Sequence, residues 1–263
     1  MSGVQMLHGS NTIVISGYAP HIATLKDGTT VTVSGQYPFA DSVNITLSRK
    51  SASAVAEAQQ PWSVLLRIPC WVDSAHVVVD STAPAAAAPC GHHKVQGLDS
   101  SKTSVSVTLF FGHSIKVVTG KWKGGGIEVH RGPLLFTLPV PATINRTLLN
   151  ATGNASVWYS RFDLDNSVGA RPWKVALQDP NTSLKFGGFT PLADVPFNYS
   201  FPAATINGRA RPVMGYTNRR GHPSAMPPTS PVGPQDYNGS LIDVVLIPIA
   251  QSNLRVTVLP TLG

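Results

Sequence analysis

Alternation of apolar and polar residues with a period of two is the dominant pattern of this 263-residue sequence. It is clearest in five windows of the first half, at 29–35, 41–48, 62–69, 75–80 and 103–111. β-Branched residues dominate these windows, and such residues fit a pleated strand with one buried face. Turn-forming clusters such as LKDGT and LDSSK separate the windows. The pattern therefore predicts a series of short strands.

A second series of apolar runs begins near Gly120. The segment GGIEVHRGPLLFTLPV predicts two strands, and further strands are expected in SVWYSRFDL, WKVALQ, LKFGGF, SLIDVVLIPI and NLRVTVLP. The Pro- and Gly-rich stretch from Asn207 to Ser240 is expected to be a long loop, and STAPAAAAP a surface loop. Only residues 51–60 favour a helix, which would end before Pro61.

These two series predict an all-β protein. The chain contains 23 glycines and 22 prolines, a balance that suits many turns between short strands. We expect two consecutive antiparallel β-sandwich domains of the jelly-roll or immunoglobulin-like type, spanning residues 1–118 and 119–263, with no helical barrel.

Charge argues against a nucleic-acid partner. The net charge is +7 and the isoelectric point about 9.6, but the basic residues are scattered. Their densest group comprises Arg209, Arg211, Arg219 and Arg220. This group lacks the interleaved aromatic residues of a single-strand binding platform. A membrane partner is not expected either, because the longest apolar candidate, LIDVVLIPIA, has only ten residues.

Glycosylation sequons point to a secretory route. The motif Asn-X-Ser/Thr occurs at Asn44, Asn145, Asn150, Asn154, Asn181, Asn198 and Asn238. These are seven of twelve asparagines, whereas about two would arise by chance in a chain with this Ser and Thr content. The first residues show no signal-peptide pattern. We therefore expect a secreted eukaryotic glycoprotein whose N-terminus is truncated in this sequence.

Cys70 and Cys90 are the only cysteines. In an oxidising compartment they are candidates for a disulfide that closes a loop of about 20 residues. Two free buried thiols fit the sequence equally well. The CGHH motif at residues 90–93 contains three zinc-binding residue types, but no second ligand pair lies at zinc spacing.

The sequence offers no assembled catalytic set. It contains two glutamates, Glu57 and Glu128, and nothing brings them together along the chain as a glycosidase pair. Asp163 and Asp165 alone supply too few oxygens for calcium. The histidines with catalytic potential lie apart from one another and fit surface or hydrogen-bonded core positions better: His21, His113, His130 and His222. We predict no catalytic, cofactor-binding or metal-binding residue in this chain.

An ordered set of motifs nevertheless resembles one family. YPFADSVNITL, LLRIPCWV, IEVHRGPLLFTL, RPWKVAL, PPTSPV and LIPIAQSNLRVTVLP follow one another along nearly the whole chain. Together they look like the C-terminal part of glycoside hydrolase family 127, the β-L-arabinofuranosidase-like proteins. Cys70 stands where the family usually has Gly, and Lys174 and Val175 stand where it has Asn-Tyr. These departures indicate a divergent member.

The resemblance implies two β-sandwich domains that follow a catalytic barrel of paired helices. The family's zinc-bound cysteine nucleophile and glutamate acid/base belong to that barrel, so zinc is expected only there. The expected function is that of the non-catalytic portion of such a hydrolase, with the barrel as its partner and carbohydrate as a second candidate partner. The alternative is a stand-alone carbohydrate-binding or structural adhesion protein. Carbohydrate binding would require an exposed aromatic row, for which Trp122, Trp158 and Trp173 are the candidates.

The Arg131-Gly132-Pro133 segment is interpreted as a structural corner where the second sandwich starts. Gly132 is expected to adopt a backbone conformation that is closed to other residues, and Pro133 to begin the next strand at a sheet edge. Arg131 is expected to pair locally or at a domain contact.

Overall fold

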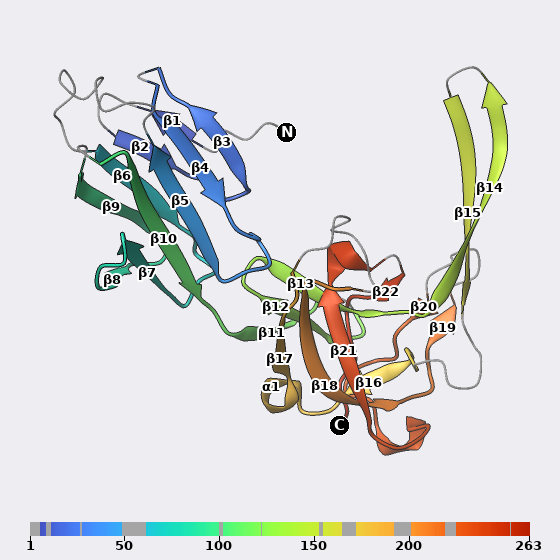
Figure 1. The fold of residues 1–263 in the computed structure, drawn as a ribbon. Helices are drawn as coiled ribbons and strands as arrows, with labels where there is room; N and C mark the ends of the chain where they lie inside the picture. The colour runs from blue at the N-terminus through green and yellow to red at the C-terminus, as the bar shows by residue number, and fades with distance from the viewer. Residues whose placement is uncertain are drawn as a thin grey trace. The chain divides into compact units, whose positions relative to one another are not determined.

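Strands make up most of the protein (Figure 1). The computed structural model describes residues 6–8, 12–26, 28–48, 62–99, 102–121, 123–152, 155–164, 172–191, 201–218, 225–252 and 254–263. Within these ranges the only α-helix, α1, is the four-residue turn Pro180–Ser183. The all-β class predicted from the sequence is therefore confirmed, and the predicted helix at 51–60 lies outside the described residues.

The chain divides into two compact units, Met1–Ser114 and Ile115–Gly263. The division expected after residue 118 falls within the strand β11 (Ile115–Thr119). In the structure β11 pairs along its whole length with β12 (Ile127–Arg131). Because this pairing holds β11 in the sheet of the second unit, the division precedes the strand.

The first unit contains two sheets. The four-stranded sheet has the order β1 (Met6–His8), β2 (Thr12–Ile15), β6 (Trp62–Ile68), β9 (Gly91–Leu98). The six-stranded sheet has the order β3 (His21–Thr24), β4 (Thr30–Ser34), β5 (Ser42–Ser48), β10 (Ser104–Gly112), β7 (Ser74–Val79), β8 (Ala85–Ala87). Neighbouring strands are antiparallel except β2 and β6, which are parallel.

Alternating burial explains why these strands form two layers. In β5 and β10 every second residue is buried, as the sequence pattern predicts. Ile45 and Leu109 from the six-stranded sheet join Ile13 and Leu66 from the four-stranded sheet in one core cluster. Burying such a side chain contributes roughly 1.5–3 kcal/mol. The two sheets thus enclose a common core.

The second unit is built on one large sheet. Its strand order is β11, β12, β13 (Leu134–Pro139), β21 (Ile242–Pro248), β18 (Ala204–Pro212), β16 (Val175–Leu177). β17 (Lys185–Phe189) also pairs with β18, and β22 (Arg255–Val256) with β13. Two short 3-10 turns, Pro234–Asp236 and Ile249–Gln251, complete the regular elements of this sheet region.

The C-terminal segment connects distant strands of this sheet. Leu259 exchanges backbone hydrogen bonds with Ile127 of β12, at 2.8 and 2.9 Å. On its other side, Leu177 of β16 donates to Pro260 at 2.8 Å and accepts from Leu262 at 2.9 Å. We call this contact of residues 259–262 with Ile127 and Leu177 the closing seam. It joins β12 to β16 and encloses the core of the unit.

The loop expected from Asn207 to Ser240 is wrong at its start, where the structure has the strand β18. Its residues 204–212 form a strand between β21 on one side and β16 and β17 on the other. The buried positions are Ala204, Ile206, Gly208 and Ala210. Three of these four residues are small, so the period of two is present but carries a weak hydrophobic signal.

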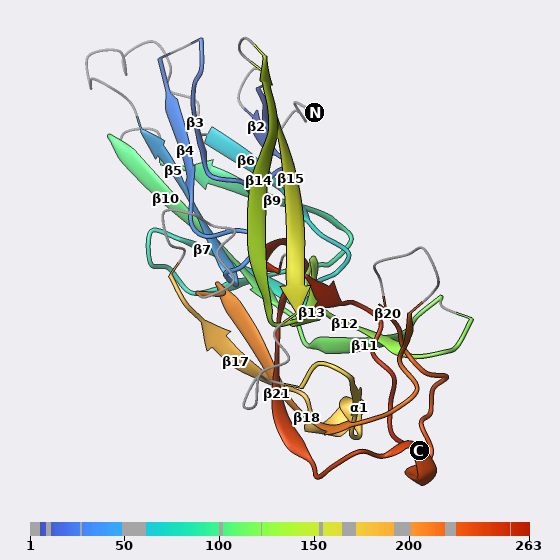
Figure 2. The same cartoon turned by 90° about the vertical axis from the view of Figure 1, so that its right-hand side faces the viewer.

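A ribbon of two strands forms a separate sheet: β14 (Ala142–Thr152) and β15 (Ala155–Leu164) pair with each other (Figure 2). The register shifts between Leu148 and Asn150. Asn145 lies opposite Arg161, and Asn150 lies opposite Val157. Because positions 157 and 161 share a face of their strand, the shift places both sequon asparagines on the same face of the ribbon.

A second short pair, β19 (Thr217–Asn218) and β20 (Ala225–Met226), lies within the expected loop.

Among the described helices, none combines the length and apolar character that crossing a bilayer would require.

Candidate functional site

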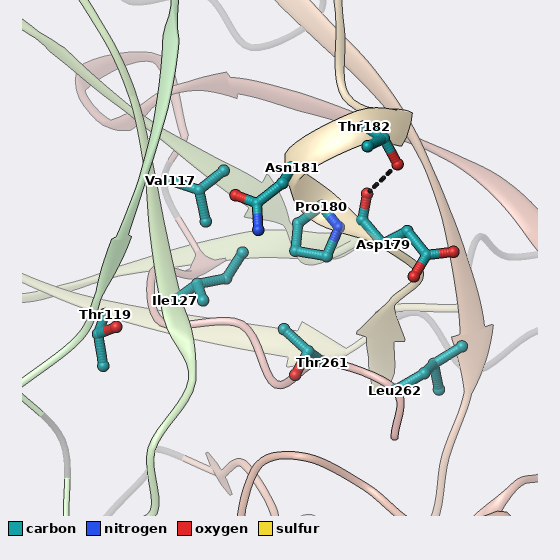
Figure 3. Close-up of a pocket in the computed structure, with 9 residues that line it drawn as sticks. All are labelled: Val117, Thr119, Ile127, Asp179, Pro180, Asn181, Thr182, Thr261 and Leu262. Carbon is teal, nitrogen blue, oxygen red and sulfur yellow. Dashed lines mark hydrogen bonds between the residues drawn. The ribbon is translucent and has the colours of Figure 1, made fainter.

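The second unit has an open pocket of about 450 Å³ beside the closing seam (Figure 3). Three parts of the unit line it: β11 and β12, the turn that forms α1, and the C-terminal segment. The lining residues are Val117, Thr119, Ile127, Asp179, Pro180, Asn181, Thr182, Thr261 and Leu262. Its volume falls within the roughly 300–1,000 Å³ of small-molecule sites.

The local sequence fixes the α1 side of this pocket. Asp179 precedes the helix with φ 38°, in the left-handed region, and Pro180 starts the helix with its fixed φ. The Asp179 carbonyl accepts hydrogen bonds from the backbone N–H groups of Thr182 and Ser183, both at 2.9 Å, and from the Thr182 hydroxyl at 3.2 Å. Asn181 is thereby held on a rigid turn at the pocket wall.

The pocket combines apolar and polar surfaces. Val117, Ile127 and Leu262 provide aliphatic side chains, while Thr119 and the Asn181 amide provide hydrogen-bonding groups. A sugar ring has the same combination of C–H faces and hydroxyl edges. Asp179, an acidic residue, also lines the pocket.

The structure describes the surroundings of four sequon asparagines: Asn44, Asn145, Asn181 and Asn238 are all exposed. Asn44 accepts a hydrogen bond from the Thr108 hydroxyl at 2.9 Å. Only Asn181 of these four lines the pocket. Asn150 is placed only by its backbone, and Asn154 and Asn198 lie outside the described residues.

The Arg131-Gly132-Pro133 segment is a two-residue hairpin turn. Arg131 pairs with Leu134, so Gly132 and Pro133 alone connect β12 to β13. Gly132 has φ 57°, and a positive φ at the first central position is typical of type II′ hairpin turns. The segment turns the chain within the second unit and does not start it, because β11 precedes it. Pro133 itself lies in the turn, and β13 pairs with β12 from Leu134 but with β21 only at Phe136 and Thr137.

Arg131 reaches from this turn to β17. Its guanidinium carbon lies 3.6 Å from the ring centroid of Phe186 and 5.2 Å from that of Phe189. The two rings meet edge to face at 64°, with centroids 4.8 Å apart. Arg131 thus acts as a structural contact inside the unit, between strands that are not neighbours in the sheet.

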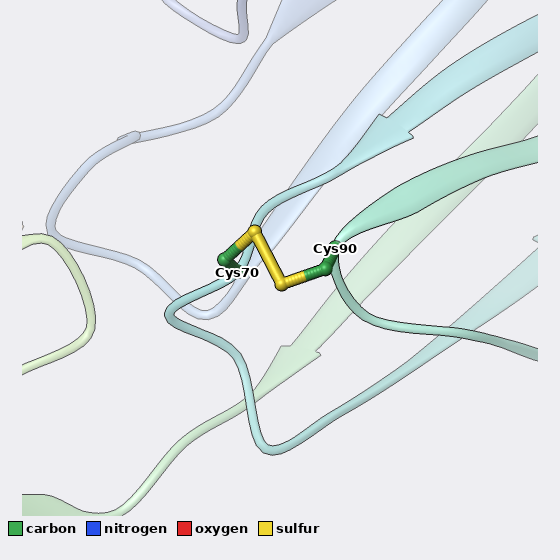
Figure 4. Close-up of a disulfide and its surroundings, with 2 residues drawn as sticks. All are labelled: Cys70 and Cys90. Atoms are coloured by element: carbon green, nitrogen blue, oxygen red, sulfur yellow. A yellow bond between two sulfur atoms is a disulfide. The ribbon is translucent and has the colours of Figure 1, made fainter.

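The structure joins Cys70 and Cys90 in a disulfide (Figure 4). Cys70 follows β6, and Cys90 precedes β9. Since β6 and β9 are antiparallel neighbours, their pairing brings the two residues together. Neither thiol is free, so the CGHH motif has no cysteine to offer zinc. Among the described residues, no three His, Cys, Asp or Glu side chains converge in a way that could hold a metal ion.

Two histidines have carboxylate neighbours that the sequence did not reveal. His130 Nε2 lies 3.2 Å from Glu128 Oε2, two residues apart on β12. His113 Nε2 lies 3.1 Å from Asp41 Oδ1, and the imidazole is 4% exposed and perpendicular to Trp71. In sequence Asp41 and His113 are far apart, so only the fold brings them together.

Of the remaining candidates, the structure describes the surroundings of His21 alone. His21 Nδ1 lies 2.8 Å from the Ala19 carbonyl oxygen. Glu57, Asp165 and His222 lie outside the described residues, and Asp163 is placed in β15 by its backbone only.

Of the three Trp candidates for an exposed aromatic row, the structure describes the side-chain surroundings of Trp173 alone, and they do not support such a row. Trp173 is half-buried against the core of the second unit and meets Tyr216 edge to face at 76°. Trp122 lies outside the described residues, and Trp158 is placed only by its backbone.

Comparison with solved structures places the fold. One structure, described as a glycoside hydrolase, matches 98% of this chain and 37% of its own length, with a TM-score of 0.59 and 16% identity. A GH127 β-L-arabinofuranosidase from Geobacillus stearothermophilus T6 matches 94% of this chain and 32% of its own, with a TM-score of 0.53 and 16% identity. A further GH127 β-arabinofuranosidase matches 95% and 35%, with a TM-score of 0.53 and 13% identity.

The chain shares its fold with part of these enzymes. It spans about a third of the length of each. The resemblance expected from the sequence motifs is therefore confirmed at the level of the fold. No protein-family model matches the sequence, and no curated protein matches it significantly.

Proposed function

We propose that this chain is the non-catalytic β portion of a larger glycoside hydrolase that removes terminal arabinofuranosyl or related residues from plant-type glycans. The observation that carries the proposal is the fold match, in which 94–98% of this chain corresponds to 32–37% of the solved enzymes. The sugar class follows from the arabinofuranosidase names of two of them.

The described residues support a non-catalytic role. Glycoside hydrolysis needs an acid and a nucleophile or activated water, positioned together across the scissile bond. Glu128 is engaged with His130, and both cysteines are joined to each other. A cysteine in a disulfide cannot act as a thiolate nucleophile. The catalytic groups would be supplied by a helical barrel that precedes this portion.

A secretory location completes the proposal. Disulfides persist in oxidising compartments, and N-linked sequons are used in the eukaryotic secretory pathway. The Cys70–Cys90 disulfide and the seven sequons are both compatible with that route.

The proposal is tested by assaying arabinose release from β-L-arabinofuranosides. The purified chain is expected to release none, and activity is expected when the chain is produced in one polypeptide with a family 127 barrel. Circular dichroism of the purified chain should first show a folded β protein. Turnover by the chain alone that Glu128→Gln abolishes would contradict the proposal.

A further inference from the structure

The pocket beside the closing seam has an unusual neighbour, because one of its walls is a glycosylation sequon. Asn181, Thr182 and Ser183 form the motif, and the first two of them line the pocket. Figure 3 shows Asn181 extending from α1 towards the side of the pocket where Val117 and Ile127 lie. Within the described part of the chain, no hydrogen bond occupies the Asn181 amide.

We propose that Asn181 carries an N-linked glycan and that the first N-acetylglucosamine ring of this glycan occupies the pocket. In the attachment step, Asn181 Nδ2 forms a bond to C1 of the sugar and loses a proton. The bond from C1 to the diphosphate of a polyisoprenyl-linked oligosaccharide donor breaks, and the lipid diphosphate leaves. The inference requires passage through the secretory pathway and is independent of the enzyme assignment.

The chemistry of the pocket fits this occupant. Val117 and Ile127 offer an aliphatic surface for the C–H face of the ring, and Thr119 offers a hydroxyl for its polar edge. Attachment at Asn181 makes the contact intramolecular, so the ring is present at a high effective concentration. Contacts too weak to bind a free monosaccharide are then sufficient to hold the attached one.

Occupation of the pocket would stabilise the closing seam. The pocket is bounded by α1 on one side and by Thr261 and Leu262 on the other. The same C-terminal segment is held to β12 and β16 by a few backbone hydrogen bonds. A ring packed between these parts adds contacts that exist only while the seam is closed, so it favours the closed state.

The chain supplies its own matched control. Asn238 is an exposed sequon asparagine in the same unit but does not line the pocket. A glycan at Asn238 adds similar mass and hydration outside the pocket. Any effect specific to Asn181 can therefore be separated from the general effect of a glycan.

The test uses the chain secreted from a eukaryotic host, with site occupancy measured by peptide mass spectrometry. Asn181 is expected to be occupied, and N181Q is expected to melt about 2–4 °C below the parent, whereas N238Q melts with it. Trimming every glycan to one N-acetylglucosamine should keep the parent's melting temperature. In protein made in bacteria without glycans, the parent and N181Q should melt together.

A second variant and a second readout keep the test independent of overall folding. T119F places a bulky ring in the pocket and leaves the sequon intact, so the glycan-dependent difference should disappear. Amide hydrogen exchange of residues 259–263 should be slower in the parent glycoprotein than in N181Q. An unoccupied Asn181, or equal behaviour of N181Q and N238Q in the glycosylated protein, would each overturn the inference.

Discussion

The guanidinium carbon of Arg131 lies 3.6 Å from the ring centroid of Phe186. Arg131 ends β12 at the hairpin turn, and Phe186 lies in β17, which pairs only with β18 among the described strands. The contact therefore joins two strands that are not hydrogen-bonded to each other. It explains why an arginine at a turn is half-buried.

A double-mutant cycle measures this contact. Arg131→Ala and Phe186→Ala are each expected to lower the free energy of unfolding, and their coupling energy is expected to be about 1 kcal/mol because the cation lies over the ring face. Urea unfolding of the four proteins gives the coupling. As a control, Arg209→Ala removes an exposed pair with Asp243 and is expected to cost less than about 0.5 kcal/mol. A coupling energy near zero would contradict the structural role of Arg131.

Gly132 is the first residue of the turn that follows Arg131. At φ 57° a side chain strains the backbone, so Gly132→Ala is expected to cost about 1 kcal/mol or more of stability in the second unit. Thermal unfolding monitored by circular dichroism measures the change. Gly91→Ala is the control, since Gly91 has an ordinary φ and the nearest atoms to an added Cβ lie 3.8–4.0 Å away. Equal stability of Gly132→Ala and the parent would show that the turn does not require glycine.

The disulfide should stabilise the first unit selectively. Cys70 and Cys90 are 20 residues apart, and closing a loop of this length removes unfolded-state entropy worth about 3 kcal/mol. Replacing both residues by Ser should lower the urea midpoint of the first unit and leave that of the second unit unchanged. Reduction of the parent should reproduce the effect. A parent that unfolds identically in oxidising and reducing buffer would refute this assignment.

The Asp80 carboxylate makes the stability of the first unit depend on pH in a predictable direction. A hydrogen bond from Lys102 at 2.8 Å and one from the Ser106 backbone N–H at 2.8 Å hold the pKa of Asp80 below its usual value. The stabilisation is therefore present at neutral pH and lost as pH falls from about 4 through the lowered pKa. Asp80→Asn should melt below the parent at pH 7, and the two should converge in acid.

The control for this prediction is Asp243→Asn, which removes a carboxylate that is 89% exposed. Its melting temperature is expected to follow the parent across the pH range. If the melting temperatures of Asp80→Asn and the parent differed by the same amount at every pH, the role of the Asp80 charge would be contradicted.

Strong alternation made the central strands of the first unit predictable. β5 and β10 were found because Val, Ile and Leu alternate with polar residues in both. β9 and β18 cannot be predicted from the pattern, for a physical reason. The sequence of β9, GHHKVQGL, buries only Val95 and Leu98, and β18 buries mainly Ala and Gly, so neither strand shows a strong hydrophobic signal.

The functional and structural sites also differ in whether local sequence or the whole fold determines them. The Arg-Gly-Pro turn could be predicted from local conformational preference, because glycine and proline act within a few residues. The Asp41–His113 pair and the pocket could not be predicted from the sequence, because their residues come from segments that only the fold brings together. The Arg131–Phe186 contact likewise depends on how the sheet of the second unit encloses its core.

We propose that this chain is part of a larger hydrolase, and full-length sequencing of the transcript is the strongest test of that proposal. We expect an uninterrupted reading frame upstream of Met1 that encodes a helical catalytic region with adjacent cysteines, so that the whole protein is about three times as long as this chain, as the 32–37% coverage of the solved enzymes implies. Transcripts in which a stop codon in the same frame closely precedes Met1 would show that this chain is not part of a larger hydrolase.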